Sequence, residues 1–65
     1  MDESRISEAQ EKLLLAEKEV MEAGQALFHL RSHELISRQA AQDIWRHLSN
    51  IYARLEMALQ MLGLE

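Results

Sequence analysis

The chain has 65 residues, a formal net charge of −4, no cysteine and no proline. This length allows one small domain, and the absence of cysteine excludes disulfides and thiolate metal sites. A lone core of this size stabilises a fold by only a few kcal/mol, so we expect support from self-association or from a partner protein. At 48% hydrophobic and 28% charged residues, the chain is too apolar for a disordered tail.

The first predicted element is a helix from about residue 4 to about residue 32. Its apolar residues recur in alternating steps of three and four, which is a heptad pattern. Larger side chains occupy position a and alanine occupies most d positions, so a neighbouring helix can approach closely. Ser7 and Gln10 have the spacing of a capping box near its start. The seam consists of Ile6, Ala9, Leu13, Ala16, Val20, Ala23, Leu27 and Leu30.

A second apolar row runs along the same helix at position b. It consists of Leu14, Met21 and Phe28, about 100° around the helix from the a row. Gly24 lies between the two rows, and glycine inside a helix costs about 1 kcal/mol relative to alanine. We interpret this glycine as the point of a close helix crossing. One antiparallel partner cannot easily cover both rows, so the b row predicts a further contact, in a homodimeric four-helix bundle or with a partner helix.

A turn is predicted at residues 33–37. Polar residues, Glu34 and Ser37, take the expected seam positions there, and Leu35 and Ile36 fall out of phase. The segment has no glycine, and the heptad phase is the same on both sides, so one unbroken helix in a long coiled coil is the alternative. We favour the hairpin because a break lets one chain bury both of its seams.

The second predicted helix covers about residues 38–62, with Ser37 as its N-cap and Gly63 as its stop. The hairpin register sets Ile6 opposite Leu62, and it brings Glu17 towards Arg54. Glu19 and Glu22 can likewise approach Arg46. Beside the seam, position e carries Trp45, Tyr52 and Leu59. The seam itself is Ala41, Ile44, Leu48, Ile51, Leu55, Ala58 and Leu62. The expected fold is therefore all-α, a single antiparallel helical hairpin over residues 1–65.

Residues that could carry chemistry are few. His29 and His33 have the spacing at which two imidazoles share a metal, but His47 is too far away to complete a site. The glutamates of the first helix spread over its flanks and outer face, with no facing cluster to form an acid/base pair. No nucleophile has a base at usable spacing, and no glycine-rich phosphate loop occurs. We therefore predict a protein that is not an enzyme and has no metal or cofactor.

In its length and its alternating large and small core layers, the chain resembles the Rop-type RNA-binding hairpins, which dimerise into four-helix bundles. That resemblance implies RNA binding as an alternative function. The RNA-binding face of those proteins is basic, however, and the first helix here is acidic. The arginines make no continuous basic row, so we expect no nucleic-acid partner. These are Arg31, Arg38, Arg46 and Arg54.

Trp45 followed by residues 53–59, Ala-Arg-Leu-Glu-Met-Ala-Leu, is similar to the last helix of small co-chaperones of type III secretion needle subunits. This resemblance implies that the chain pairs with a larger chaperone and keeps an aggregation-prone needle subunit soluble. The acidic N-terminus is unlike a secretory signal, and the longest apolar run is too short to span a bilayer. We therefore expect a cytoplasmic location.

Together, these patterns predict a small helical adaptor or co-chaperone that self-associates or packs on a partner helix. The residues expected at its partner surface come from the b row, the glycine and the e row. They are Leu14, Met21, Gly24, Phe28, Trp45, Tyr52 and Leu59.

Overall fold

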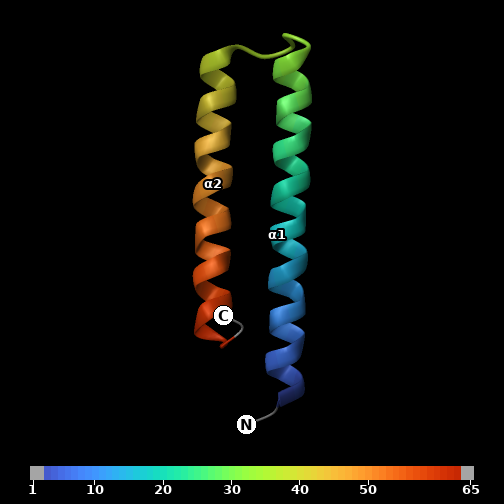
Figure 1. Ribbon diagram of the computed structural model, residues 1–65, viewed down its shortest axis with the longest axis vertical. Coiled ribbons are helices and arrows are strands. Elements are labelled where there is room, and N and C mark those ends of the chain that lie inside the picture. Colours follow the sequence, from blue (N-terminus) through green and yellow to red (C-terminus); the bar gives the residue numbers. More distant parts are fainter. Residues whose placement is uncertain (1–2, 64–65) are drawn as a thin grey trace.

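The structure is a computed structural model that describes residues 3–63, and this part of the chain forms two helices joined by a short turn (Figure 1). Helix α1 covers Glu3–Ser32 and helix α2 covers Arg38–Met61. They run antiparallel, side by side, along a rod whose extents are 50 × 14 × 14 Å. The predicted hairpin is confirmed, and the alternative of one unbroken helix is wrong.

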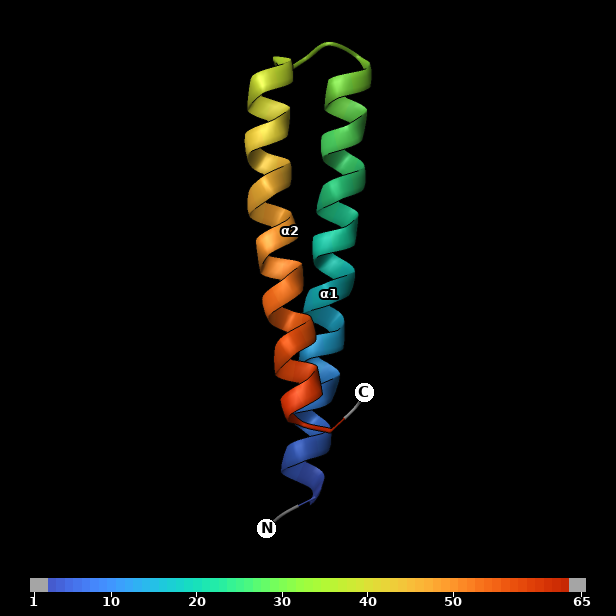
Figure 2. The same cartoon turned by 60° about the vertical axis from the view of Figure 1, so that its left-hand side comes forward.

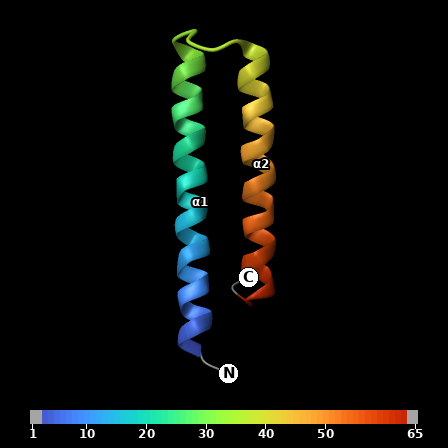
Figure 3. The same ribbon diagram turned by 180° about the vertical axis from the view of Figure 1, so that it is seen from behind.

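The two helices wind around one another slightly along their length. In Figure 2, α2 passes in front of α1 towards the open end of the hairpin, whereas Figure 3 shows the pair side by side from behind. Helix α1 has 30 residues and α2 has 24, so the start of α1 projects beyond the end of α2 (Figure 2). Neither helix contains a stretch that is both long and apolar enough to cross a membrane.

The ends of α2 follow the local chemistry that the sequence predicts. The Ser37 hydroxyl accepts a hydrogen bond from the Ala40 amide at 3.0 Å, which is an N-cap. Gly63 has a φ of 84°, the left-handed conformation that ends many helices. The capping box expected at Ser7 is wrong, because α1 begins at Glu3. The Gln10 side-chain amide instead donates to the Leu62 carbonyl oxygen at 3.3 Å, across the two helices.

The turn ends α1 with a Schellman motif that has no glycine. The Leu35 amide donates to the Leu30 carbonyl at 2.9 Å, and the Glu34 amide donates to the Arg31 carbonyl at 3.0 Å. These are the two hydrogen bonds of that motif. The residue that donates the shorter-range bond normally takes a left-handed conformation. Here that residue is Glu34, with a φ of 57°. The turn therefore holds a side chain where glycine is usual.

The contact between the helices is centred on positions a and e, and the predicted a/d seam is only half right. The buried apolar residues are Leu27 and Ala41, at position a, and Leu59, at position e. In contrast, the d residues Ile44 and Ile51 are 42% and 46% exposed. Most d positions of α1 are alanine, whereas the e positions of α2 after Arg38 hold Trp, Tyr and Leu. Rolling the helices towards e buries more apolar area.

The same roll decides the charged contacts. Glu17, at position e, is buried in the helix contact, and Arg54 is exposed on α2. Within residues 3–63, the expected pair of Glu17 with Arg54 is not formed, nor are those of Arg46 with the acids of α1. The ion pair between Lys12 and Glu8, at 3.3 Å, lies within α1. Charge therefore does not set the register of the hairpin in the way the sequence predicted.

Candidate interaction groove

The hairpin leaves most of its large apolar side chains uncovered. In the described part of the chain, three apolar residues are buried. The exposed ones are far more numerous, and they lie on both helices and in the turn. They are Leu14, Leu15, Met21, Phe28, Leu30, Leu35, Ile44, Trp45, Ile51, Met57 and Met61. A protein surface with this much uncovered apolar area marks a site of association.

One side of the hairpin carries a groove, which we call the Trp45 groove. The Trp45 ring lies across its middle and separates two hollows, of about 270 and 320 Å³. The first, towards the turn, is lined by Gly24, Leu27, Phe28, Arg31, Ala41, Gln42 and Trp45. The second, towards the open end, is lined by Val20, Met21, Gly24, Trp45, Leu48, Ser49 and Tyr52.

Gly24 allows the tryptophan to occupy this place. A Cβ atom built on Gly24 would lie 3.0 Å from Trp45 Cζ3, which is closer than ordinary van der Waals contact. The close approach predicted at this glycine is therefore made, within the chain, by a side chain from α2. The rest of the indole faces outward, since Trp45 is 57% exposed. The glycine thus sets the depth of the groove.

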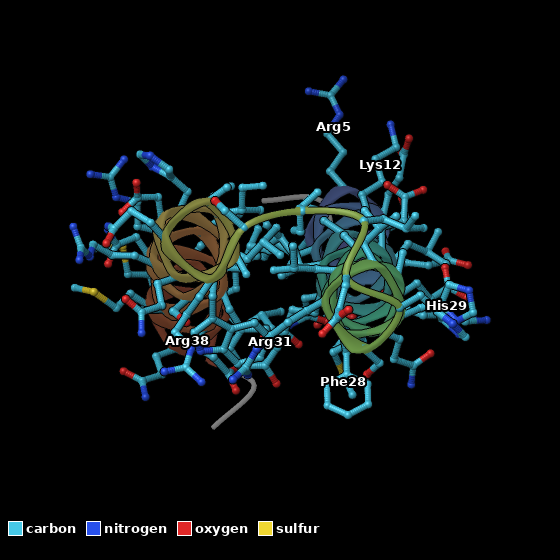
Figure 4. All side chains as sticks on the ribbon, turned by 90° about the horizontal axis from the view of Figure 1, so that it is seen from above. Arg5, Lys12, Phe28, His29, Arg31 and Arg38 are labelled. Carbon is cyan, nitrogen blue, oxygen red and sulfur yellow. The ribbon has the colours of Figure 1, made fainter. Side chains whose placement is uncertain are left out.

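The turn end of the groove is cationic. Arg31 lines the first hollow, and Arg38 begins α2. Seen from above the turn, both arginines lie on the same side of the hairpin as Phe28 (Figure 4). Arg5 and Lys12 lie on the opposite side, and His29 lies on the outer edge of α1 (Figure 4). The groove therefore has its own positive end, separate from the basic residues of the other side.

Two acidic residues lie towards the open end of the hairpin, beyond the residues that line the two hollows. Glu17 is only 9% exposed, and its Oε2 atom has no hydrogen-bond partner among residues 3–63. Glu56, at position b of α2, likewise has a buried Oε2 atom without a partner. The contacts of Gln10 with Leu62 and of Gly24 with Trp45 bracket this level of the helix pair. They place Glu17 opposite the segment 52–56, so the two acids lie at the same level of the hairpin.

The predicted partner residues do not all lie in the groove. Met21, Phe28 and Trp45 are exposed there, and Gly24 and Tyr52 are half-buried in its walls. Leu14, 50% exposed, continues the b row towards the open end. The prediction for Leu59 is wrong, because its side chain is 1% exposed and packs inside the hairpin.

Sequence reasoning missed two kinds of residue. Glu17 was expected on a solvated flank, and only its place at position e, in line with Gln10 and Gly24, could have indicated burial. The d residues Leu30, Ile44 and Ile51, expected in the seam, remain partly exposed. Their heptad position puts them on the opposite side of the hairpin from the Trp45 groove. We call this second surface the d-row face.

The histidines of α1 form a pair without further ligands. The rings of His29 and His33 have centroids 4.3 Å apart and are tilted by 53°. Between residues 3 and 63, no group of three or more His, Cys, Asp or Glu side chains could hold a metal ion. The apolar groove is therefore the candidate functional site.

Comparison of the chain with protein-family models, curated protein sequences and solved structures finds no match. The function of this protein is accordingly argued from its own geometry.

Proposed function

We propose that the protein is a non-enzymatic interaction module that associates with a helix through the Trp45 groove. The observation that supports this function best is the balance of apolar side chains within residues 3–63: eleven large ones are exposed and three apolar residues are buried. A hairpin with so small a core gains much of its stability from whatever covers the exposed rows. Association is thus part of the fold as well as the function.

The chemistry of the groove favours a binding surface over a catalytic one. Arg31 and Gln42 are the polar side chains that line the first hollow, and Ser49 and Tyr52 line the second. A catalytic serine needs a base within hydrogen-bond reach, and histidine, the commonest base, lines neither hollow. The remaining lining is apolar and fits the ridge of a helix.

The shape of the groove suits a helical occupant. Its two hollows follow one another along the hairpin axis on either side of Trp45, as successive side chains of a helix would need. An amphipathic helix offers such side chains at intervals of three and four residues. An adaptor or co-chaperone role, as the resemblance to needle-subunit co-chaperones implies, belongs to this proposal and would place the helix on a partner protein.

Molecular mass in solution tests the function, with two variants matched in chemistry and exposure. Met21→Glu puts a charge in the second hollow, and Leu15→Glu puts the same charge on an equally exposed position outside the groove. We expect the wild type and Leu15→Glu to sediment as a complex, with themselves or with a co-purified protein. Met21→Glu should sediment as a free chain. A complex that survives Met21→Glu would overturn the assignment of the groove.

A further inference from the structure

We propose that the occupant of the Trp45 groove is a second copy of this chain, packed antiparallel about a two-fold axis at the level of Gly24. The inference rests on the proposed function and names its partner. In this dimer the two grooves face each other, so each copy supplies the ridge that fills the other. The result is a four-helix bundle in which every neighbouring pair of helices is antiparallel.

The exposed area is the first argument. A compact monomer of 7.5 kDa exposes about 4,200 Å². The hairpin exposes 5395 Å², about 1,200 Å² more than that expectation. A standard stable interface covers about 800 Å² on each partner. One self-complementary contact along the groove would therefore remove about two thirds of this excess from each chain.

The distribution of charge selects the direction of packing. Arg31 lies seven residues after Gly24, and Glu17 lies seven residues before it. An axis across the helices at Gly24 therefore brings Arg31 of one copy level with Glu17 of the other. A two-fold axis along the helices would instead set Arg31 level with Arg31 and Glu17 level with Glu17, diagonally across the bundle. Like charges at these positions disfavour the parallel arrangement.

The buried carboxylate is an independent observation with the same implication. Glu17 is nine-tenths buried, and its Oε2 atom accepts no hydrogen bond within the described chain. A buried charge without a partner is costly, and a nearby cation removes most of that cost. Arg31 of the same chain cannot supply it, since fourteen residues of helix separate the two by about 21 Å. Arg31 of a second copy lies at the level of Glu17 in this dimer, and it reaches the carboxylate once the Glu17 side chain turns out of the helix contact.

The apolar residues agree with this register. Phe28 lies four residues after Gly24 and Met21 lies three residues before it. The same axis therefore brings Phe28 of one copy level with Met21 of the other. Both side chains are more than half exposed in the hairpin. Each would enter a hollow beside Trp45, and a phenylalanine against a methionine is a favourable contact.

Charge reversal in two separate chains tests the contact between copies. We expect Arg31→Glu to weaken the dimer at least about tenfold. In each of the two symmetric contacts, the new glutamate would face Glu17 of the other copy, and the like charges would repel. Glu17→Arg, for the same reason, should weaken its own dimer. A mixture of the two variants should form a heterodimer of near wild-type affinity, since both contacts are then complementary. Failure of the mixture to associate, with both variants helical by circular dichroism, would overturn the proposal.

Cross-linking tests the direction without relying on charge, because the native chain has no cysteine. Met21→Cys/Phe28→Cys should form disulfide-linked dimers at least about tenfold faster than either single variant, since two Cβ atoms must approach within about 4.5 Å. The two cysteines of one chain lie about 10.5 Å apart along α1 and cannot join. Fast cross-linking by both single variants would show parallel packing and overturn the proposal.

The failures of the two proposals look different. A wild-type chain that is monomeric alone, but whose Trp45 fluorescence shifts to the blue on binding a different protein, would overturn the second copy and leave the interaction module intact. A monomer with no partner and an unshifted Trp45 emission would overturn both. The tryptophan is a specific reporter, because the chain has one Trp and its ring lies in the groove.

Discussion

The Trp45 ring lies directly on Gly24, where a Cβ atom would approach Cζ3 to 3.0 Å. Gly24→Ala therefore has two opposed effects on the hairpin. Alanine raises helix propensity by about 1 kcal/mol, and the ring must move by a few tenths of an ångström. Because over half of Trp45 is exposed, it can move outward. We expect the free energy of unfolding to change by less than about 1 kcal/mol, and the dimer to weaken.

The matched control for this variant is Ala26→Gly, which places glycine at an exposed position of α1 outside the groove. It should lower the free energy of unfolding by about 1 kcal/mol and leave both the Trp45 emission and the mass in solution unchanged. Thermal melts, fluorescence and sedimentation separate the two effects. A Gly24→Ala chain with wild-type emission and wild-type mass would contradict this account of the glycine.

Glu34 holds the left-handed position of the turn, with a φ of 57°. A residue with a Cβ atom pays about 1 kcal/mol or more for that conformation, and glycine does not. We expect Glu34→Gly to raise the free energy of unfolding by about 1 kcal/mol. Glu34→Ala keeps the Cβ atom and should give no such gain. Urea unfolding of the three chains measures the difference, and an equal gain from alanine would assign the effect to the lost charge.

Leu59 is the most buried residue of the core, with 1% of its surface exposed. Leu59→Ala should lower the free energy of unfolding by about 2–5 kcal/mol. The substitution leaves a cavity between the two helices, and few neighbouring side chains can move in to fill it. Met57→Ala removes a similar volume from a side chain that is 59% exposed and should change stability by less than about 0.5 kcal/mol. Circular dichroism melts compare the two. Equal melting temperatures would show that Leu59 is not a core residue in solution.

Glu17 is a buried carboxylate with an unpartnered oxygen, so its removal should stabilise a single hairpin. In the dissociated Met21→Glu background, Glu17→Met should raise the free energy of unfolding by about 1–3 kcal/mol. Glu11→Met, on the exposed surface of α1, is the control and should change it little. In the wild-type background the same Glu17→Met change should weaken the dimer. A stability loss in the dissociated chain would mean that Glu17 has a partner within it.

The hairpin was predictable because its ends carry local signals. Ser37 caps α2 as expected, and the out-of-phase Leu35 and Ile36 mark the turn between the two helices. The left-handed residue was not predictable in this way. The Schellman motif normally shows itself by a glycine, and Glu34 gives no such signal.

The roll of the helices was not predictable from the heptad pattern. Positions d and e flank position a on its two sides, so both a/d and a/e contacts satisfy the same periodicity. Whether the helices meet at a/d or at a/e depends on the side-chain volumes on the two flanks. The d flank of α1 carries small residues such as Ala23, whereas the e flank of α2 carries Tyr52 and Leu59. The same choice buries Glu17, which reads as a surface acid in the sequence. Opposing side chains must be compared in pairs before such a contact can be predicted.

The turn at Glu34 separates two helices whose heptads are in the same phase. Leu27, Glu34 and Ala41 all occupy position a, so a helical Glu34 would join α1 and α2 into one straight rod. Two such rods, side by side and antiparallel, would form every α1–α2 contact of the hairpin between different chains. This is domain swapping, and it leaves the core unchanged. The choice between a closed hairpin and an exchanged pair therefore depends on Glu34 and the Ser37 cap, and not on the apolar rows.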